Sequence, residues 1–189
     1  IIHQKPLVLY PSLPRLVEAV VKSLDPTHAM VRSSLAKSAT LMINELVQTY
    51  PTIAFHGGTQ RLAVGTHDGP VVLYDLKTGT RLYVLDGHKC AVTACSFSPD
   101  GRRFLSMSLA EELVLIWQLH AGVLDMFRRP SRFGARHEPS SDCRSIQIHL
   151  GPAAQLSQAD TLRQVKFEWR DSRSVRLCVG QAHVNVGVV

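Results

Sequence analysis

The sequence predicts an α+β protein in which a helical hairpin precedes an incomplete β-propeller of two to three four-stranded blades. Two observations support this fold class. Apolar residues recur with a period of 3.6 before Pro51 and with a period of two after Thr52. Beyond that change, features recur at offsets of 42 and 43, as Phe55 matches Phe97 and Tyr74 matches Trp117. A repeat of about 40–45 residues with four strands per unit is typical of propeller blades.

The first predicted helix lies in the segment SLPRLVEAVVKSL, which begins at Ser12. Ser12 is expected to cap this helix, and Asp25-Pro26 is expected to end it. The spacings of one, three and four residues place the apolar side chains on one helical face: Leu16, Val17, Val20, Val21 and Leu24.

A second helix is predicted from Ala29 to Tyr50, where Pro51 ends it. Its apolar side is expected to carry Val31, Leu35, Met42, Ile43, Leu46, Val47 and Tyr50. Two amphipathic helices joined by a short turn form the hairpin that α-solenoids stack. Because one hairpin cannot bury both of its apolar faces, we expect residues 1–51 to be the end of an α-solenoid that begins further upstream.

Residues 52–127 are predicted to form two blades. In the first, strands are separated at His67-Asp68-Gly69 and at Lys77-Thr78-Gly79, which are strong turn signals. The segment CAVTACSFSPDGRRFLSMSLAEELVLIWQLHAG repeats the same pattern. Residues 143–189 also alternate, in CRSIQIHL and in RQVKFEWRDSRSVRLCVGQAHVNVGV, and they predict a degenerate third blade.

Residues 128–142 are predicted to be a flexible basic linker. The chain has a formal net charge of +6, and most of the excess falls after residue 127. A solvated linker is the first interpretation, and peripheral contact with an anionic membrane is the second. The residues concerned are Arg128, Arg129, Arg132 and Arg136. No aromatic interleaving supports nucleic-acid binding.

The cysteines indicate a reducing compartment, and we expect a cytoplasmic protein, peripheral to endomembranes if the arginines contact lipid. There are four cysteines and no C-x-x-C pair, whereas secreted domains stapled by disulfides are denser in cysteine. No apolar run approaches the length of a membrane span, and no signal-peptide pattern opens the chain.

His88, Cys90 and Cys95 are the residues that could suggest a metal or redox site. Cys90 and Cys95 are five apart in a predicted strand, so their side chains are expected on opposite faces. Zinc ligands must converge on one point, which this spacing does not allow. The chain also lacks a Gly-x-Ser-x-Gly elbow, a phosphate-binding glycine loop and a His-Glu-x-x-His motif. We therefore expect no metal, no cofactor and no enzymatic activity.

The segments LDGHKCAVTACSFSPDG, FLSMS and LVLIWQL resemble a WD repeat. The resemblance implies a hydrogen-bonded network of histidine, hydroxyl, acid and tryptophan that locks the strands of a blade. In the second blade it implies His88, Ser108, Glu111 and Trp117, with glutamate in place of aspartate and one extra residue before it. In the first blade it implies Thr66, Asp68 and Tyr74, without the Gly-His pair, whose positions fall in the preceding helix.

The order of the segments resembles the C-terminal part of the rabconnectin-3 beta group of WD-repeat proteins. LVEAVVKSLDP comes first, then FHGGTQRLAVGTHDGPVVLYDLKTGTRLYVLDGHK, and then ACSFSPDGRR. This resemblance implies a non-enzymatic scaffold that binds proteins through propeller loops. The implied partners are a rabconnectin-3 alpha-like protein and subunits of the vacuolar proton pump, and the implied processes are pump assembly and vesicle traffic. A WD-repeat adaptor of another pathway, such as a ubiquitin-ligase substrate receptor or a coat component, is the alternative.

Overall fold

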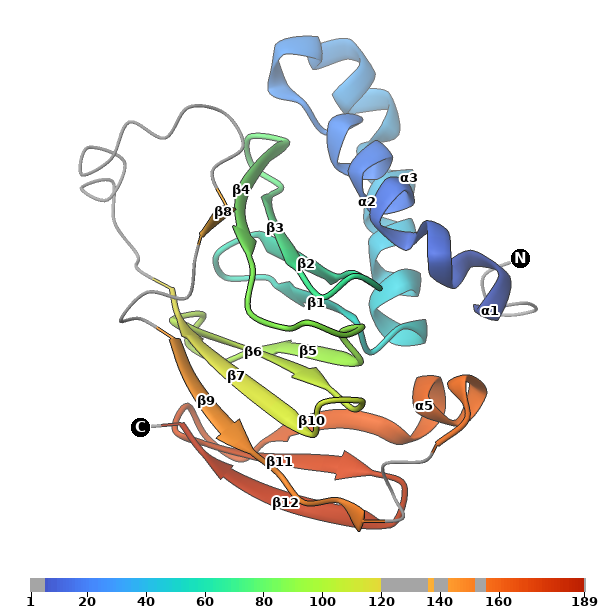
Figure 1. Ribbon diagram of the computed structural model, residues 1–189. Coiled ribbons are helices and arrows are strands. Elements are labelled where there is room, and N and C mark those ends of the chain that lie inside the picture. The colour runs from blue at the N-terminus through green and yellow to red at the C-terminus, as the bar shows by residue number, and fades with distance from the viewer. Residues whose placement is uncertain (1–5, 120–135, 138–142, 152–155, 189) are drawn as a thin grey trace.

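The structure is a computed structural model that describes residues 6–119, 136–137, 143–151 and 156–188 of the 189-residue chain. Figure 1 shows a helical hairpin packed against the first of three stacked sheets. The helices are α1 (Pro6–Leu9), α2 (Leu13–Lys22), α3 (Ala29–Thr49) and α5 (Gln158–Gln164). Short 3-10 turns at Tyr10–Ser12 and Pro26–His28 precede α2 and α3. The predicted α+β class, with a hairpin before a partial propeller, is confirmed.

Three sheets follow the hairpin. The first consists of β1 (Ile53–His56), β2 (Arg61–Gly65), β3 (Val71–Asp75) and β4 (Thr80–Leu85), with β8 (Arg136–His137) parallel to β4. The second consists of β5 (Ala94–Phe97), β6 (Arg103–Ser108), β7 (Leu113–Gln118) and β9 (Cys143–Gln147). The third, as far as the structure describes the chain, consists of β10 (Val165–Trp169), β11 (Ser174–Val179) and β12 (Ala182–Gly187).

Strand register gives the repeat a structural basis. In the first sheet Leu62 pairs with Phe55 on one side and with Tyr74 on the other. In the second sheet Phe104 pairs with Phe97 and with Trp117 in the same way. The residues matched at offsets of 42 and 43 therefore occupy equivalent places in two blades.

The prediction that residues 143–147 open the third blade is wrong. They form β9, which pairs antiparallel with β7 and completes the second blade as its outer strand. Alternation in CRSIQIHL indicates a strand but not its partner, and the partner precedes it in sequence by more than twenty residues. Within the predicted linker, Arg136 lies in β8, whereas Arg128, Arg129 and Arg132 lie outside the described residues.

The hairpin covers one face of the first sheet (Figure 1). Leu13, Val17 and Val21 of α2 are buried there with Ile43 and Leu46 of α3. The sheet contributes Ile53, Leu62, Val64, Tyr74 and Leu76 to the same cluster. Ser12 precedes α2 as expected, but its side chain makes no capping hydrogen bond.

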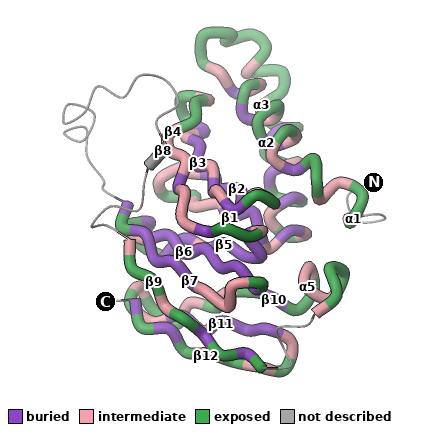
Figure 2. The backbone as a smooth tube through the Cα atoms, viewed as in Figure 1, coloured by how far each residue is buried: buried purple, intermediate pink, exposed green. Residues whose placement is uncertain are grey.

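The apolar face predicted for the second helix is only partly correct. Val31 and Leu35 are 48% and 41% exposed, and the buried residues of α3 begin at Ala39. Figure 2 shows the first half of α3 as mostly exposed and the second half as increasingly buried. The helix period alone could not show this, because the buried residues of α3, which are Ala39, Ile43 and Leu46, all lie in its second half. That residues 1–51 end an α-solenoid stays a prediction.

Two further apolar layers join the sheets. Successive strand residues point to opposite faces, so neighbours in β6 enter different layers. Phe104 packs with Ala63, Leu73 and Trp117 between the first and second sheets. Leu105 packs with Ile116, Val175 and Leu177 between the second and third sheets. The third sheet differs from the others because its second face is polar: it carries Lys166, Glu168, Arg176, His183 and Asn185.

The short helix α5 was not predicted. Its signal was the spacing of Ser157 and Asp160, since serine before a helix with an acid three residues later is a capping pattern. The Ser157 hydroxyl accepts a hydrogen bond from the Asp160 N–H at 3.1 Å.

The burial pattern of α3 predicts how two leucine substitutions should differ. Leu46→Ala should lower the free energy of unfolding by about 2–5 kcal/mol, because Leu46 is 1% exposed between helix and sheet. Leu41→Ala, on the same helix but 57% exposed, should change it by no more than about 0.5 kcal/mol. Urea denaturation of both variants measures the difference. Equal losses would contradict the packing of the hairpin on the first sheet.

Candidate functional site

A buried polar network joins the strands of the second blade. His88, which is 3% exposed, precedes β5 in the loop from β4. Its Nε2 lies 3.0 Å from the Ser106 hydroxyl of β6, and its Nδ1 lies 2.9 Å from Glu111 Oε2 in the β6–β7 turn. The Trp117 indole of β7 donates to the same Ser106 hydroxyl at 3.0 Å. The network therefore ties a loop, two strands and a turn together.

Close packing around Gly87 fixes the position of His88. A Cβ atom at Gly87 would approach the Leu115 and Trp117 side chains to within 2.7 and 2.9 Å, so only glycine allows the loop to lie against the tryptophan. The β2–β3 turn of the first blade reaches the same loop, because a Cβ at Gly69 would lie 2.2 Å from the His88 carbonyl oxygen.

The hydrogen-bond partners in the network show which nitrogen of His88 carries its proton. Indole N–H can only donate, so the Ser106 oxygen accepts from Trp117 and its O–H is available for His88 Nε2. That leaves the proton of a neutral imidazole on Nδ1, from which it donates to the Glu111 carboxylate. Glu111 also accepts the Lys89 backbone N–H at 3.0 Å. Every polar side-chain group named in this network has a hydrogen-bond partner, as buried polar groups require.

Burial and hydrogen bonding set the charges in this network. Burial lowers the pKa of His88 below its ordinary value, against the opposing influence of the Glu111 carboxylate. Burial alone would raise the pKa of Glu111. The hydrogen bonds from the Lys89 N–H and from His88 outweigh it, and the pKa is lowered. The network is therefore held as a neutral histidine beside an ionised glutamate.

The hydroxyl in this network belongs to Ser106, and the expectation of Ser108 is wrong. Both residues are buried on the same face of β6. Trp117 pairs with Phe104, so Ser106 is its diagonal neighbour across the strands, whereas Ser108 lies a further pair away, opposite Leu113. Within the described part of the chain the Ser108 hydroxyl makes no hydrogen bond of ordinary geometry. The Ser108 hydroxyl contributes the smallest of the influences that lower the pKa of Glu111.

The structure does not bring together the residues expected for a network in the first blade. The Thr66 hydroxyl donates to the Pro70 carbonyl at 2.8 Å, and Asp68 is exposed in the same turn. Tyr74 instead packs among the helices, where burial and the nearby Glu18 carboxylate raise its pKa to about 12. At an offset of 42, Leu46 and Val64 stand where the second blade has His88 and Ser106.

The four cysteines are all free thiols. Cys90 is exposed in the loop before β5 and not in a strand as predicted, whereas Cys95 is buried in β5 among apolar residues. Burial raises the pKa of the Cys95 thiol strongly. Over the residues described, no group of three or more His, Cys, Asp or Glu side chains could hold a metal ion. No described helix is long and apolar enough to cross a membrane.

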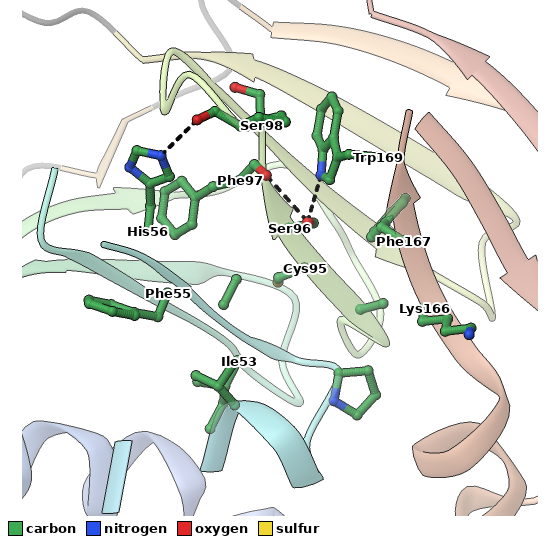
Figure 3. Close-up of a pocket in the computed structure, with 15 residues that line it drawn as sticks. Ile53, Phe55, His56, Cys95, Ser96, Phe97, Ser98, Lys166, Phe167 and Trp169 are labelled. Carbon is green, nitrogen blue, oxygen red and sulfur yellow. Dashed lines mark hydrogen bonds between the residues drawn. The ribbon is translucent and has the colours of Figure 1, made fainter. Parts of the chain in front are cut away.

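A cavity of about 350 Å³ lies where the first strands of the three sheets meet (Figure 3). Its apolar lining includes Ile53, Phe55, Phe97, Phe167 and Trp169. Its polar lining includes His56, Ser96, Ser98 and Lys166.

The polar groups of this cavity already have partners. Since a carbonyl oxygen only accepts, His56 donates from Nε2 to the Pro99 oxygen at 3.2 Å, and its Nδ1 accepts from the Thr59 N–H at 3.2 Å. The Ser96 hydroxyl accepts from Trp169 Nε1 at 2.8 Å. Neighbouring groups therefore hold the His56 ring and the Ser96 hydroxyl in place.

Comparison with known proteins points to one family for the second repeat. A family model described as "WD domain, G-beta repeat" matches residues 79–110, a stretch that contains both His88 and Ser106. The chain is 36% identical over 67 residues to transcription initiation factor TFIID subunit 5 of Caenorhabditis elegans, covering 35% of this chain and 10% of that protein. It is 30% identical over 125 residues to pre-mRNA-processing factor 19 homolog 2 of Arabidopsis thaliana, covering 64% of this chain and 22% of that protein.

The chain thus spans 10% and 22% of the lengths of these two relatives. Among solved structures, it is similar to the β-propeller domain of Myceliophteria thermophila Cps50 (Swd1). The sequence identity is 20% and the TM-score 0.47, with 75% of this chain and 35% of that chain covered.

Two serine substitutions test which hydroxyl stabilises the protein through the network. Ser106→Ala leaves the Trp117 N–H and His88 Nε2 without partners, so the free energy of unfolding should fall by about 1–3 kcal/mol. Ser108→Ala removes a buried hydroxyl that lies outside the three hydrogen bonds and should cost clearly less. Urea midpoints of both variants give the comparison, and a larger loss for Ser108→Ala would show that the assignment to Ser106 is mistaken.

The network should also make stability depend on pH. Because the folded pKa of His88 is lowered, the unfolded chain binds more protons just below about pH 6.5. The stabilisation that comes from keeping His88 neutral is therefore complete above about pH 6.5. It is lost as the pH falls through the pKa that His88 has in the folded protein. The pKa of Glu111 is also lowered, so protonation of Glu111 in more acidic solution lowers the free energy of unfolding further.

Urea unfolding at about pH 7.5 and about pH 5.5 measures this loss in the wild type and in His88→Gln. The variant should lose less stability between the two pH values. An identical pH dependence in both proteins would mean that the loss comes from other groups.

Proposed function

We propose, on the premise that this chain is a WD40-repeat protein, that it is a non-enzymatic scaffold that holds other proteins in an assembly. The observation that carries the proposal is the chain of hydrogen bonds that runs from Trp117 through Ser106 and His88 to Glu111. These residues are of the types that many enzymes use, yet each is occupied in holding the strands of a blade. Rigid sheets joined by exposed turns suit binding to protein partners.

We further propose a cytoplasmic role in assembly of the vacuolar proton pump and in vesicle traffic, as the resemblance to the rabconnectin-3 beta group implies. The order of a helical hairpin followed by blades supports this, whereas the relatives described above carry other names. The partners would be a rabconnectin-3 alpha-like protein and pump subunits, with peripheral membrane contact through Arg128, Arg129, Arg132 and Arg136.

The alternative is a WD-repeat adaptor of another pathway, whether a ubiquitin-ligase substrate receptor, a coat component or a nuclear assembly. The names of two relatives favour the last, since one is a transcription initiation factor subunit and the other a pre-mRNA-processing factor.

Affinity purification of the protein from its own cells tests both levels of the proposal. We expect a stoichiometric set of co-purifying proteins that includes proton-pump subunits, identified by mass spectrometry against an unrelated tagged protein. Recovery of ligase, coat or nuclear-complex subunits without pump subunits would overturn the pump role and keep the scaffold. Recovery of no specific protein would overturn the scaffold itself.

A further inference from the structure

We propose that the cavity along β1, β5 and β10, together with the arginine-bearing turns at its end, docks an extended acidic segment of a partner protein. One aromatic side chain of that segment would enter the cavity. The proposal rests on the scaffold function proposed above and assigns it a binding surface.

The cavity follows the line where three sheet edges meet. β1, β5 and β10 are each terminal strands of their sheets. The Cys95 N–H donates to the Pro51 carbonyl at 2.7 Å just before β1, and Trp169 of β10 donates to Ser96 of β5. Figure 3 shows the labelled side chains of all three strands around a common space. The rings of Phe55, Phe167 and Trp169, which are partly exposed in this lining, favour an aromatic guest.

Basic turns lie directly beside one end of the cavity. Arg170 follows the lining residue Trp169, and Arg102 lies in the turn that follows Pro99. The Arg103 guanidinium donates to the Ser172 carbonyl at 3.0 Å, which holds the β5–β6 and β10–β11 turns together. Arg102, Arg170 and Arg173 are exposed.

Acidic side chains in these turns leave a positive balance. Asp100 accepts hydrogen bonds from the Ser98 hydroxyl and the Arg102 N–H. Asp171 accepts from the N–H groups of Arg173 and Ser174. The two carboxylates are thus directed into their own turns. They are outnumbered by the three arginines of the two turns, with Arg103 at the start of β6 as a fourth. On the lining strand β10, Lys166 and Glu168 form an ion pair at 2.6 Å. An acidic ligand is the electrostatic match for this end of the cavity.

The size of the site favours a peptide over a nucleic acid. A volume of about 350 Å³ is at the low end for ligand pockets and suits one large side chain. A nucleic acid would instead need a basic stripe that contacts several successive phosphates. An acidic peptide with a single aromatic anchor therefore fits this site.

A synthetic peptide with a central phenylalanine between runs of glutamate is the probe. Binding is followed by fluorescence anisotropy of the labelled peptide and by the emission of Trp169, which is half-buried, whereas Trp117 is buried. Arg102→Glu/Arg173→Glu should weaken binding at least about tenfold. The matched control Arg15→Glu/Lys37→Glu makes the same change in net charge at exposed positions of the hairpin and should bind like the wild type.

The anchor is tested on the peptide, so that no protein variant is needed. Replacing its phenylalanine with alanine should also weaken binding at least about tenfold. The proposal is overturned if the two peptides bind equally, if the control variant loses as much affinity as the turn variant, or if a single-stranded oligonucleotide binds as tightly as the phenylalanine peptide.

The affinity purification separates failure of this site from failure of the scaffold. Partners that wild type recovers should be lost with Arg102→Glu/Arg173→Glu and kept with Arg15→Glu/Lys37→Glu. Full retention by the turn variant would overturn the docking site and leave the scaffold standing. Absence of any partner from the wild type would overturn the scaffold, and the peptide measurements would then still decide the site.

Discussion

The constraint on which the structure depends is that the second sheet is apolar on both faces. In β6, five consecutive residues from Phe104 to Ser108 are buried although their side chains alternate between faces. Such a sheet must be covered twice, and the first and third sheets cover it. The first sheet then has an apolar face of its own to bury, and the helical hairpin covers that face. The order of layers thus follows from the need to remove each apolar face from water.

The two repeats solve the same packing problem with different chemistry. In the second blade, a loop bearing Gly87 and His88 lies against Leu115 and Trp117, and a chain of hydrogen bonds satisfies the polar groups of His88, Ser106 and Trp117. In the first blade, the positions equivalent to Gly87 and His88 belong to α3. Leu46 of α3 and Val64 of β2 lie in one apolar cluster, without polar side-chain atoms. The first blade has no loop that could supply a histidine in the place of His88, so a polar network there would be incomplete. This is why Thr66, Asp68 and Tyr74 serve separate local roles.

The sequence was informative wherever the cause was local. Helix periodicity and proline predicted both long helices, and the Asp-Gly and Thr-Gly turns separated the strands of the first blade. It was less informative wherever the cause was a partner distant in the chain. The choice of Ser106 over Ser108 depends on the register of β6 against β7, and the place of β9 depends on its pairing with β7, more than twenty residues earlier. Exposure of Val31 and Leu35 depends on how far the first sheet extends along α3.

The polarity of the third sheet explains why we place the partner beside β1, β5 and β10. Its inner residues Val165, Leu177 and Val186 are buried, whereas Lys166, Arg176 and Asn185 occupy the other face. Neither outer sheet therefore needs another layer to bury an apolar face, because helices cover the first and water can solvate the third. Partly exposed aromatic side chains remain in β1 and β10, beside charged turns: Phe55, Phe167 and Trp169. A docked chain would remove the exposed parts of these rings from water, which favours binding.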